Sequence, residues 1–163
     1  MNANTDVIES HFAYLQLIDF YKRQMESSSL YEQSFVQSCL SMIAIANEAW
    51  EAFQDEGGRL PNHTGFIELS DYYQRKKMFK EAAWVEEQSI KLWGVSVGID
   101  YESWVEYLIK DRNKEEAQMV LDLAIDEFGD DSDWQIYQRE ISDLPSASWC
   151  ILYAGCSKNN FYP

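Results

Sequence analysis

The stretch that decides the fold reads FIELSDYYQRKKMFKEAAWVEEQSIKLWG over residues 66–94 and YESWVEYLIKDRNKEEAQMVLDLAIDEFG over residues 101–129. In both segments large apolar side chains recur at steps of three and four residues, the period of a helix with one buried face. Each segment ends in glycine, a common helix terminator. The sequence therefore predicts two helix pairs, 66–77 with 79–93 and 101–111 with 114–128.

The two segments are also similar to each other at a fixed spacing. Ala82 and Ala117 each lie four residues into the second helix of a pair, each directly after a glutamate, and they are 35 residues apart. Self-similarity at such a period is typical of helical repeat proteins, and the tetratricopeptide period is 34 residues. Degenerate helix pairs also arise in helical bundles that are not repeats.

On these residues, the stretch from about 63 to 130 resembles two tetratricopeptide repeats. The resemblance implies an all-α fold of antiparallel helical hairpins, a right-handed bundle or short solenoid of about seven helices. Small residues let paired helices approach closely, and large ones fill the groove toward the next hairpin. The positions that match the family pattern are Phe66, Leu69, Tyr73, Ala82, Ser89, Tyr101, Trp104, Leu108, Ala117, Leu121 and Ala124.

The departures from the family pattern are specific. Ser70 and Val105 stand where the family favours glycine, Glu86 stands where it has a large apolar residue, and Gly94 and Gly129 stand where it has proline.

The resemblance also implies a concave surface on the first helix of each pair. Its ligand positions would be Thr64, Ile67, Asp71, Gln74, Arg75, Ile99, Glu102, Glu106, Ile109 and Lys110. The Lys, Asn and Arg side chains with which the family holds chaperone C-termini are not reproduced.

Around the central pairs the sequence predicts further helices in one domain, residues 1–163. Residues 1–58 form a hairpin of two helices, the second a single long helix that starts at a capping box, Ser29 to Glu32, and stops at Gly57. Residues 131–145 form a capping helix that begins at Ser132 and is closed by Pro145. Residues 146–163 form a tail, either a short helix or an extended segment.

The totals favour a soluble protein that binds another protein. The net charge of −15 repels nucleic acid and anionic membranes and attracts basic proteins over long range. No run of about 18 apolar residues is present, and residues 1–26 carry charges where a signal peptide is apolar, so we expect a cytoplasmic protein. Cys39, Cys150 and Cys156 match no zinc or redox spacing and are expected to be reduced thiols.

No catalytic or cofactor motif is found in the sequence. Phosphate-binding glycine loops, nucleophile elbows and the His-Glu-x-x-His metal motif are all missing. His11 has no ligand partner three or four residues away, and His63 beside Asn62 and Thr64 suits the start of a helix. We expect a protein that is not an enzyme, with no cofactor and no metal. An enzyme that uses dispersed carboxylates is an alternative to a protein-binding function.

The uneven distribution of charge along the sequence suggests a candidate binding site, a C-terminal acidic face. Residues 115–133 contain eight acidic residues and no Lys or Arg, and like charges one helical turn apart cost a few tenths of a kcal/mol each. The simplest interpretation is a solvated face. The functional interpretation is that this face masks a basic partner, such as a toxin or a nucleic-acid-binding protein, as immunity proteins and antitoxins do, with Trp134 as an exposed anchor. Its residues would be Asp122, Asp126, Glu127, Asp130, Asp131, Asp133 and Trp134.

The alternative is a tetratricopeptide-like scaffold or adaptor that binds a peptide in its concave groove. Its residues would be Ile67, Asp71, Gln74, Arg75, Glu102, Glu106 and Lys110. In either case the partner is a protein, with no direct nucleic-acid binding and no membrane, and a homodimer is possible.

Overall fold

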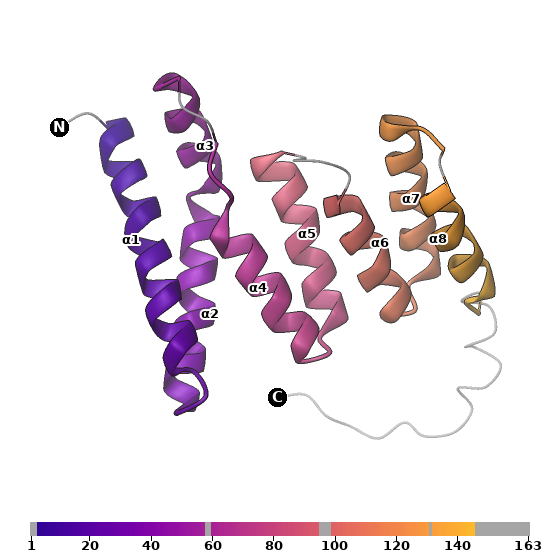
Figure 1. Ribbon diagram of the computed structural model, residues 1–163, viewed down its shortest axis with the longest axis horizontal. Coiled ribbons are helices and arrows are strands. Elements are labelled where there is room, and N and C mark those ends of the chain that lie inside the picture. The colour runs from indigo at the N-terminus through magenta and orange to yellow at the C-terminus, as the bar shows by residue number, and fades with distance from the viewer. Residues whose placement is uncertain (1–2, 58–59, 95–98, 131, 146–163) are drawn as a thin grey trace.

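The computed structural model describes residues 3–57, 60–94, 99–130 and 132–145, and within these ranges it contains eight helices and no strand (Figure 1). The all-helical class predicted from the sequence is therefore confirmed. The helices are α1 (Ala3–Gln24), α2 (Ser29–Ala44), α3 (Ala46–Asp55), α4 (Thr64–Arg75), α5 (Phe79–Trp93), α6 (Ile99–Lys110), α7 (Lys114–Phe128) and α8 (Ser132–Asp143).

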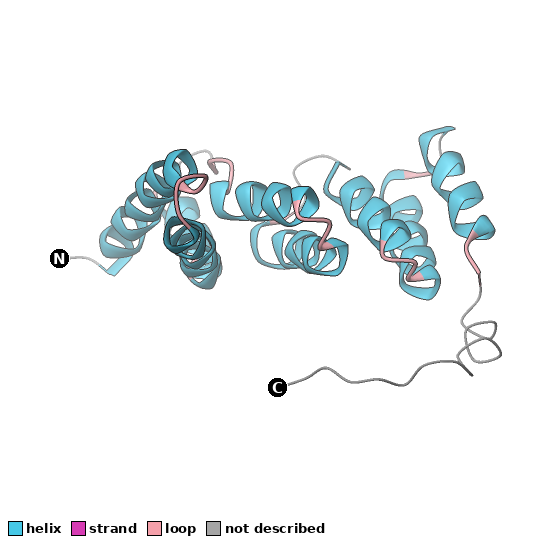
Figure 2. Cartoon of the chain, turned by 90° about the horizontal axis from the view of Figure 1, so that it is seen from below, coloured by secondary structure: helices cyan, strands magenta, loops and turns pink. Residues whose placement is uncertain are grey.

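The helices follow one another in chain order along the long axis of the molecule (Figures 1 and 2). Helix α4 packs on α5 and α6 packs on α7, as the two predicted pairs require, and α5 joins the pairs by packing on α6. The bounds of α5 and α7 are those expected from the sequence. This arrangement of hairpins is compatible with tetratricopeptide-like packing.

The 35-residue spacing is preserved in the turns inside the two pairs. Lys77 and Arg112 have φ of 59° and 60°, the left-handed region that non-glycine residues rarely adopt. The following residues repeat the same backbone bond at 2.9 Å, from Met78 N–H to the Tyr73 carbonyl and from Asn113 N–H to the Leu108 carbonyl. Both hairpins therefore reverse with the same turn.

Replacing Arg112 by glycine is expected to stabilise the chain by about 0.5–1 kcal/mol. Glycine removes the steric cost of the left-handed conformation, about 1–2 kcal/mol, and part of this gain is offset by the greater entropy of glycine in the unfolded chain. Urea unfolding of the Arg112→Gly variant measures the change. A stability equal to or below that of the wild type would contradict the turn geometry.

The glycines that end the two pairs explain why proline is missing there. Gly94 has φ 86° and ψ 164°, and Gly129 has φ 89° and ψ 160°. This region of backbone space is open essentially to glycine alone, whereas proline is restricted to φ near −65°. The chain therefore leaves each helix pair through a backbone conformation that a proline at these positions could not adopt.

The prediction of one long helix after Ser29 is wrong, because the helix is interrupted at Ile45. Ile45 has φ −101° and ψ 7°, outside the helical region, and it separates α2 from α3. The two segments pack on different neighbours: α2 lies against α1 and α4, whereas α3 lies against α1 and α5. A straight helix could not bury both apolar faces, so tertiary packing overrides the continuous periodicity of the sequence.

The N-terminal capping prediction is also wrong by one residue. The N-cap of α2 is Ser28, whose hydroxyl accepts from Leu30 N–H at 3.2 Å. The Glu32 carboxylate instead accepts from the Tyr72 hydroxyl at 3.1 Å and pairs with Lys76 Nζ at 2.5 Å, which ties α2 to the end of α4.

Three other start signals are confirmed, whereas α4 and α6 each begin two residues before the predicted starts at residues 66 and 101. Asn113 Oδ1 accepts from Glu116 N–H, and Asn113 Nδ2 donates to the Glu116 carboxylate at 2.5 Å, so the two side chains cap α7 together. His63 Nδ1 accepts from Phe66 N–H at 3.4 Å and caps α4. Helix α8 starts at Ser132 and ends two residues before Pro145, as expected.

Two apolar clusters form the core, and α5 contributes to both. Val85 belongs to the N-terminal cluster around Phe35 and Met42, whereas Ala82 belongs to the C-terminal cluster around Trp104. Ser70 in α4, at a position where the family has glycine, is hydrogen-bonded to Glu86 in α5, so two departures from the repeat pattern meet.

The structure also bears on the predictions for the cysteines and for membrane-spanning segments. Cys39 is fully buried as a free thiol, whereas Cys150 and Cys156 lie outside the described residues, as does the predicted tail, 146–163. Within the described part of the chain no helix has both the length and the apolar character needed to cross a bilayer.

Candidate functional site

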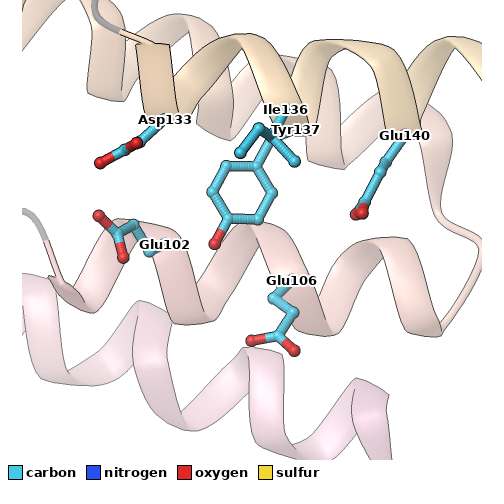
Figure 3. A pocket seen from close by; sticks show the side chains of 6 residues that line it. All are labelled: Glu102, Glu106, Asp133, Ile136, Tyr137 and Glu140. Carbon is cyan, nitrogen blue, oxygen red and sulfur yellow. The ribbon is translucent and has the colours of Figure 1, made fainter.

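A groove between α6 and α8 gathers four carboxylates around one tyrosine. Its cavity of about 360 Å³ is shown in Figure 3. We refer to it as the acidic groove. Helix geometry accounts for the two walls, because residues three, four and seven apart share a face. The acidic groove is lined by Glu102 and Glu106 of α6 and by Asp133, Ile136, Tyr137 and Glu140 of α8.

The opposite faces of the same two helices fix the walls in place. Trp134 and Ile141 of α8 are 3% and 1% exposed, and they pack in the C-terminal core with Trp104 and Leu108 of α6. The ring of Trp134 also contacts that of Tyr137, with centroids 6.1 Å apart. The core therefore holds Tyr137 so that its ring lies between the carboxylates (Figure 3).

Trp134 was expected to be an exposed anchor for a partner, and this prediction is wrong. The residue is buried because it shares an apolar stripe with Ile141, seven residues later, and α8 needs that stripe to dock on the preceding helices. Trp134 supports the acidic groove from behind, and a partner cannot reach it in the folded chain.

The carboxylates of the acidic groove affect the pKa of Tyr137. Burial raises the pKa of this phenol, and the negative charges of Glu102, Glu106, Glu140 and Asp133 raise it further. All four carboxylates thus act on one point in the centre of the groove. Such a field favours a positive charge at that point.

Part of the charge of one wall is already balanced. Glu106 forms an ion pair with Lys110, one turn later on α6, at 2.5 Å. The Lys110 ammonium also lies over the rings of Phe79 and Tyr107, at 5.6 and 5.7 Å from their centroids. Lys110 therefore lies on the α5 side of α6, and it is not among the residues that line the acidic groove.

The carboxylates of the acidic groove can accept hydrogen bonds from a cationic group. Within residues 3–57, 60–94, 99–130 and 132–145, no three His, Cys, Asp or Glu side chains are placed to hold a metal together. Figure 3 shows the carboxylates spread along the groove, with Glu102 and Asp133 near one end and Glu140 toward the other. Spread carboxylates can accept several hydrogen bonds from a guanidinium group.

The predicted C-terminal acidic face is divided by the structure. Asp122 and Asp126 are exposed on α7, where Gln118 Nε2 donates to Asp122 at 2.8 Å. Glu127 accepts from the Tyr101 hydroxyl at 3.0 Å, and Asp130 is exposed beyond α7. Of this set, only Asp133 lines the acidic groove, and Asp131 lies outside the described residues.

The predicted concave set is divided as well. Glu102 and Glu106 line the acidic groove, and Lys110 follows on the same helix. The α4 members do not line it: Ile67 is 50% exposed, Asp71 and Arg75 are exposed, and Gln74 is half-buried. The side chain of Ile99 lies outside the described residues.

Sequence reasoning missed three residues of the acidic groove. Ile136, Tyr137 and Glu140 follow Asp133 at three, four and seven residues, so they share its helical face. That spacing was available as a signal. The spacing does not show which helix packs against that face. Helix α8 contacts α6, although the whole of α7 separates the two helices in the sequence.

Comparisons of the chain with protein-family models, with curated proteins and with solved structures gave no match. The residues of the acidic groove and the charge of the chain carry the proposal that follows.

Proposed function

We propose that this chain is a non-enzymatic, acidic protein-binding module that masks a basic partner protein, in the manner of immunity proteins and antitoxins. The observation that carries the proposal is the acidic groove, in which four carboxylates from two helices surround Tyr137. The net charge of −15 adds a long-range field that accelerates the approach of a basic protein.

The occupant of the acidic groove in this proposal is an arginine or lysine side chain of the partner. Its apolar stem lies along Ile136, which is 55% exposed, and its cation lies near the Tyr137 ring. Carboxylates on both walls then accept its hydrogen bonds. Arginine suits the site better than lysine, because its planar fork can bond to both walls at once.

A capture experiment tests the proposal with the charge of the groove removed. Glu102→Gln, Asp133→Asn and Glu140→Gln are combined in a tagged chain, which leaves Glu106 paired with Lys110. We expect the wild-type chain to retain a basic protein at low salt and release it at high salt. The triple variant is expected to lose at least tenfold of this retention.

A matched control separates the groove from the total charge. Glu9, Glu26 and Glu48 are exposed in the N-terminal part of the chain, and their replacement by Gln changes the net charge by the same three units. This control is expected to retain the partner. Equal loss in both variants, or retention in both, would show that the acidic groove is not the binding site.

A second candidate function is the scaffold that binds a peptide along the first helices of the two pairs. It is supported by the exposed stripe of α4, in which Ile67, Asp71 and Arg75 follow one another at four-residue steps. Replacing Gln74 and Arg75 by Ala distinguishes the two candidates in the same capture experiment. A loss of the partner in this variant, with retention in the groove variant, would favour the scaffold.

A further inference from the structure

The two histidines of the chain lie side by side in the interior, far along the chain from each other. His11 of α1 is fully buried, His63 at the start of α4 is 3% exposed, and their ring centroids are 5.4 Å apart. Trp93 of α5 stacks on His11 at 5.7 Å with an interplanar angle of 8°, and Phe53 of α3 meets His11 edge-on at 5.3 Å. The pair thus lies where four helices meet.

The hydrogen bonding of the pair is incomplete. Among the described residues, neither ring nitrogen of His11 has a hydrogen-bond partner, and neither has Nε2 of His63. Nδ1 of His63 accepts from Phe66 N–H, so it holds a lone pair, and the proton of the neutral ring is on Nε2. A second proton on His63 must therefore go to Nδ1, the atom that caps α4, and would remove the cap.

Among the described residues, neither histidine forms an ion pair with a carboxylate. The groups that face the pair from α1, α3, α4 and α5 are neutral rings, and the Cys39 thiol of α2 stays neutral because burial raises its pKa to about 12. The carboxylate of Glu68 on α4 is already paired with Lys22 of α1 at 2.5 Å. The carboxylate of Glu9, on α1, is exposed to water. The neutral rings are Phe12, Phe53, Phe66 and Trp93.

Burial lowers the pKa of both histidines, that of His63 to about 3, and repulsion from His11 adds to the shift at His63. The nearby backbone of His63 and Met42 acts in the opposite direction and offsets the lowering of the His63 pKa only in part. A cation at the start of α4 would also oppose the positive end of the helix dipole. Geometry, capping and charge therefore all favour the neutral pair.

We propose that His11 and His63 form an acid-sensitive latch, a buried neutral pair that holds α1 and α3 against α4 and α5 at neutral pH and holds them progressively less tightly as the pH falls below about 6.5. The latch is independent of the function proposed above. It makes the N-terminal half of the molecule responsive to acidification.

The sign of the pH dependence follows from proton binding. Below about pH 6.5 the unfolded chain binds protons at both imidazoles, whereas burial makes the folded chain bind them less readily, so stability falls as the pH falls. The stability that the neutral histidines contribute is fully present above about pH 6.5. It is lost as the pH falls toward the folded pKa of His63, about 3. Each pH unit in this window lowers the folding equilibrium constant by up to about tenfold per histidine.

The test compares the full wild-type chain with a His11→Phe, His63→Asn double variant. Phenylalanine keeps an aromatic ring in the cluster, and asparagine keeps a side-chain acceptor for the start of α4. Because the chain has two histidines, and carboxylates titrate nearer pH 4, the range from pH 7 to 5 isolates the latch. Urea unfolding at each pH gives the folding constant, and hydrogen exchange gives the protection of α1 amides.

Between pH 7 and 5 we expect the wild-type folding constant to fall more than tenfold, with early loss of α1 protection, and that of the double variant to fall less than threefold. Equal pH dependence in the two chains would overturn the latch. NMR titration of the wild-type imidazoles needs no variant: rings that stay neutral down to pH 5 in the folded chain support the latch. A ring that titrates near pH 6.5 without loss of structure would overturn it.

Discussion

Replacing Glu102, Asp133 and Glu140 together by lysine is expected to slow association with the basic partner by about 10- to 1000-fold at low ionic strength. These side chains line both walls of the acidic groove, and their reversal turns an attractive field at Tyr137 into a repulsive one. The measurement is stopped-flow association of the chain with the basic protein recovered by capture, at salt concentrations from about 10 to 150 mM, where screening grows.

The control for this prediction carries the same net charge. Each reversal adds two charges, so the groove variant changes the net charge from −15 to −9, and reversal of Glu9, Glu26 and Glu48 does the same. We expect the control to associate several-fold faster than the groove variant at every salt concentration. Identical rates would mean that only the total charge matters, and that the acidic groove has no special role.

Replacing Trp134 by alanine is expected to lower the free energy of unfolding by about 3–5 kcal/mol, the usual cost of removing a large buried aromatic side chain. Trp134 is 3% exposed in the C-terminal core and contacts the ring of Tyr137. The loss should loosen α8, and with it one wall of the acidic groove. Urea unfolding measures the stability, and the same capture experiment measures binding.

Trp84 of α5 is the matched control, because it is 42% exposed. Its replacement by alanine is expected to cost less than about 1 kcal/mol, as surface substitutions usually do. A small effect at Trp134, or effects of equal size at the two tryptophans, would contradict the packing of α8 on the core.

The helices of the two central pairs could be predicted because local signals define them. Asn113 caps α7 through contacts within three residues, and Gly94 and Gly129 follow directly after the last helical residue. The interruption at Ile45 has no comparable local signal. It arises because α2 and α3 share α1 as a neighbour but otherwise pack on different helices, α2 on α4 and α3 on α5, and those contacts join segments far apart in the sequence.

The acidic groove could be predicted only in fragments for the same reason. Glu102 and Glu106 were assigned to a concave surface and Asp133 to a separate acidic face. Their union depends on α8 packing against both α7 and α6, and no local periodicity encodes the contact with α6. The prediction for Trp134 is wrong because an aromatic residue beside acidic ones suggests exposure, whereas its spacing to Ile141 is that of a buried stripe.

The position of Tyr137 allows its pKa to report whether the acidic groove is occupied. Burial raises the pKa of the Tyr137 phenol and the four carboxylates raise it further, so a cation bound among them would lower this pKa and shift the alkaline titration of the ring toward lower pH. A small guanidinium salt added to the isolated chain should already produce the shift. Site-specific labelling of tyrosine would then report ligand entry before any natural partner is in hand.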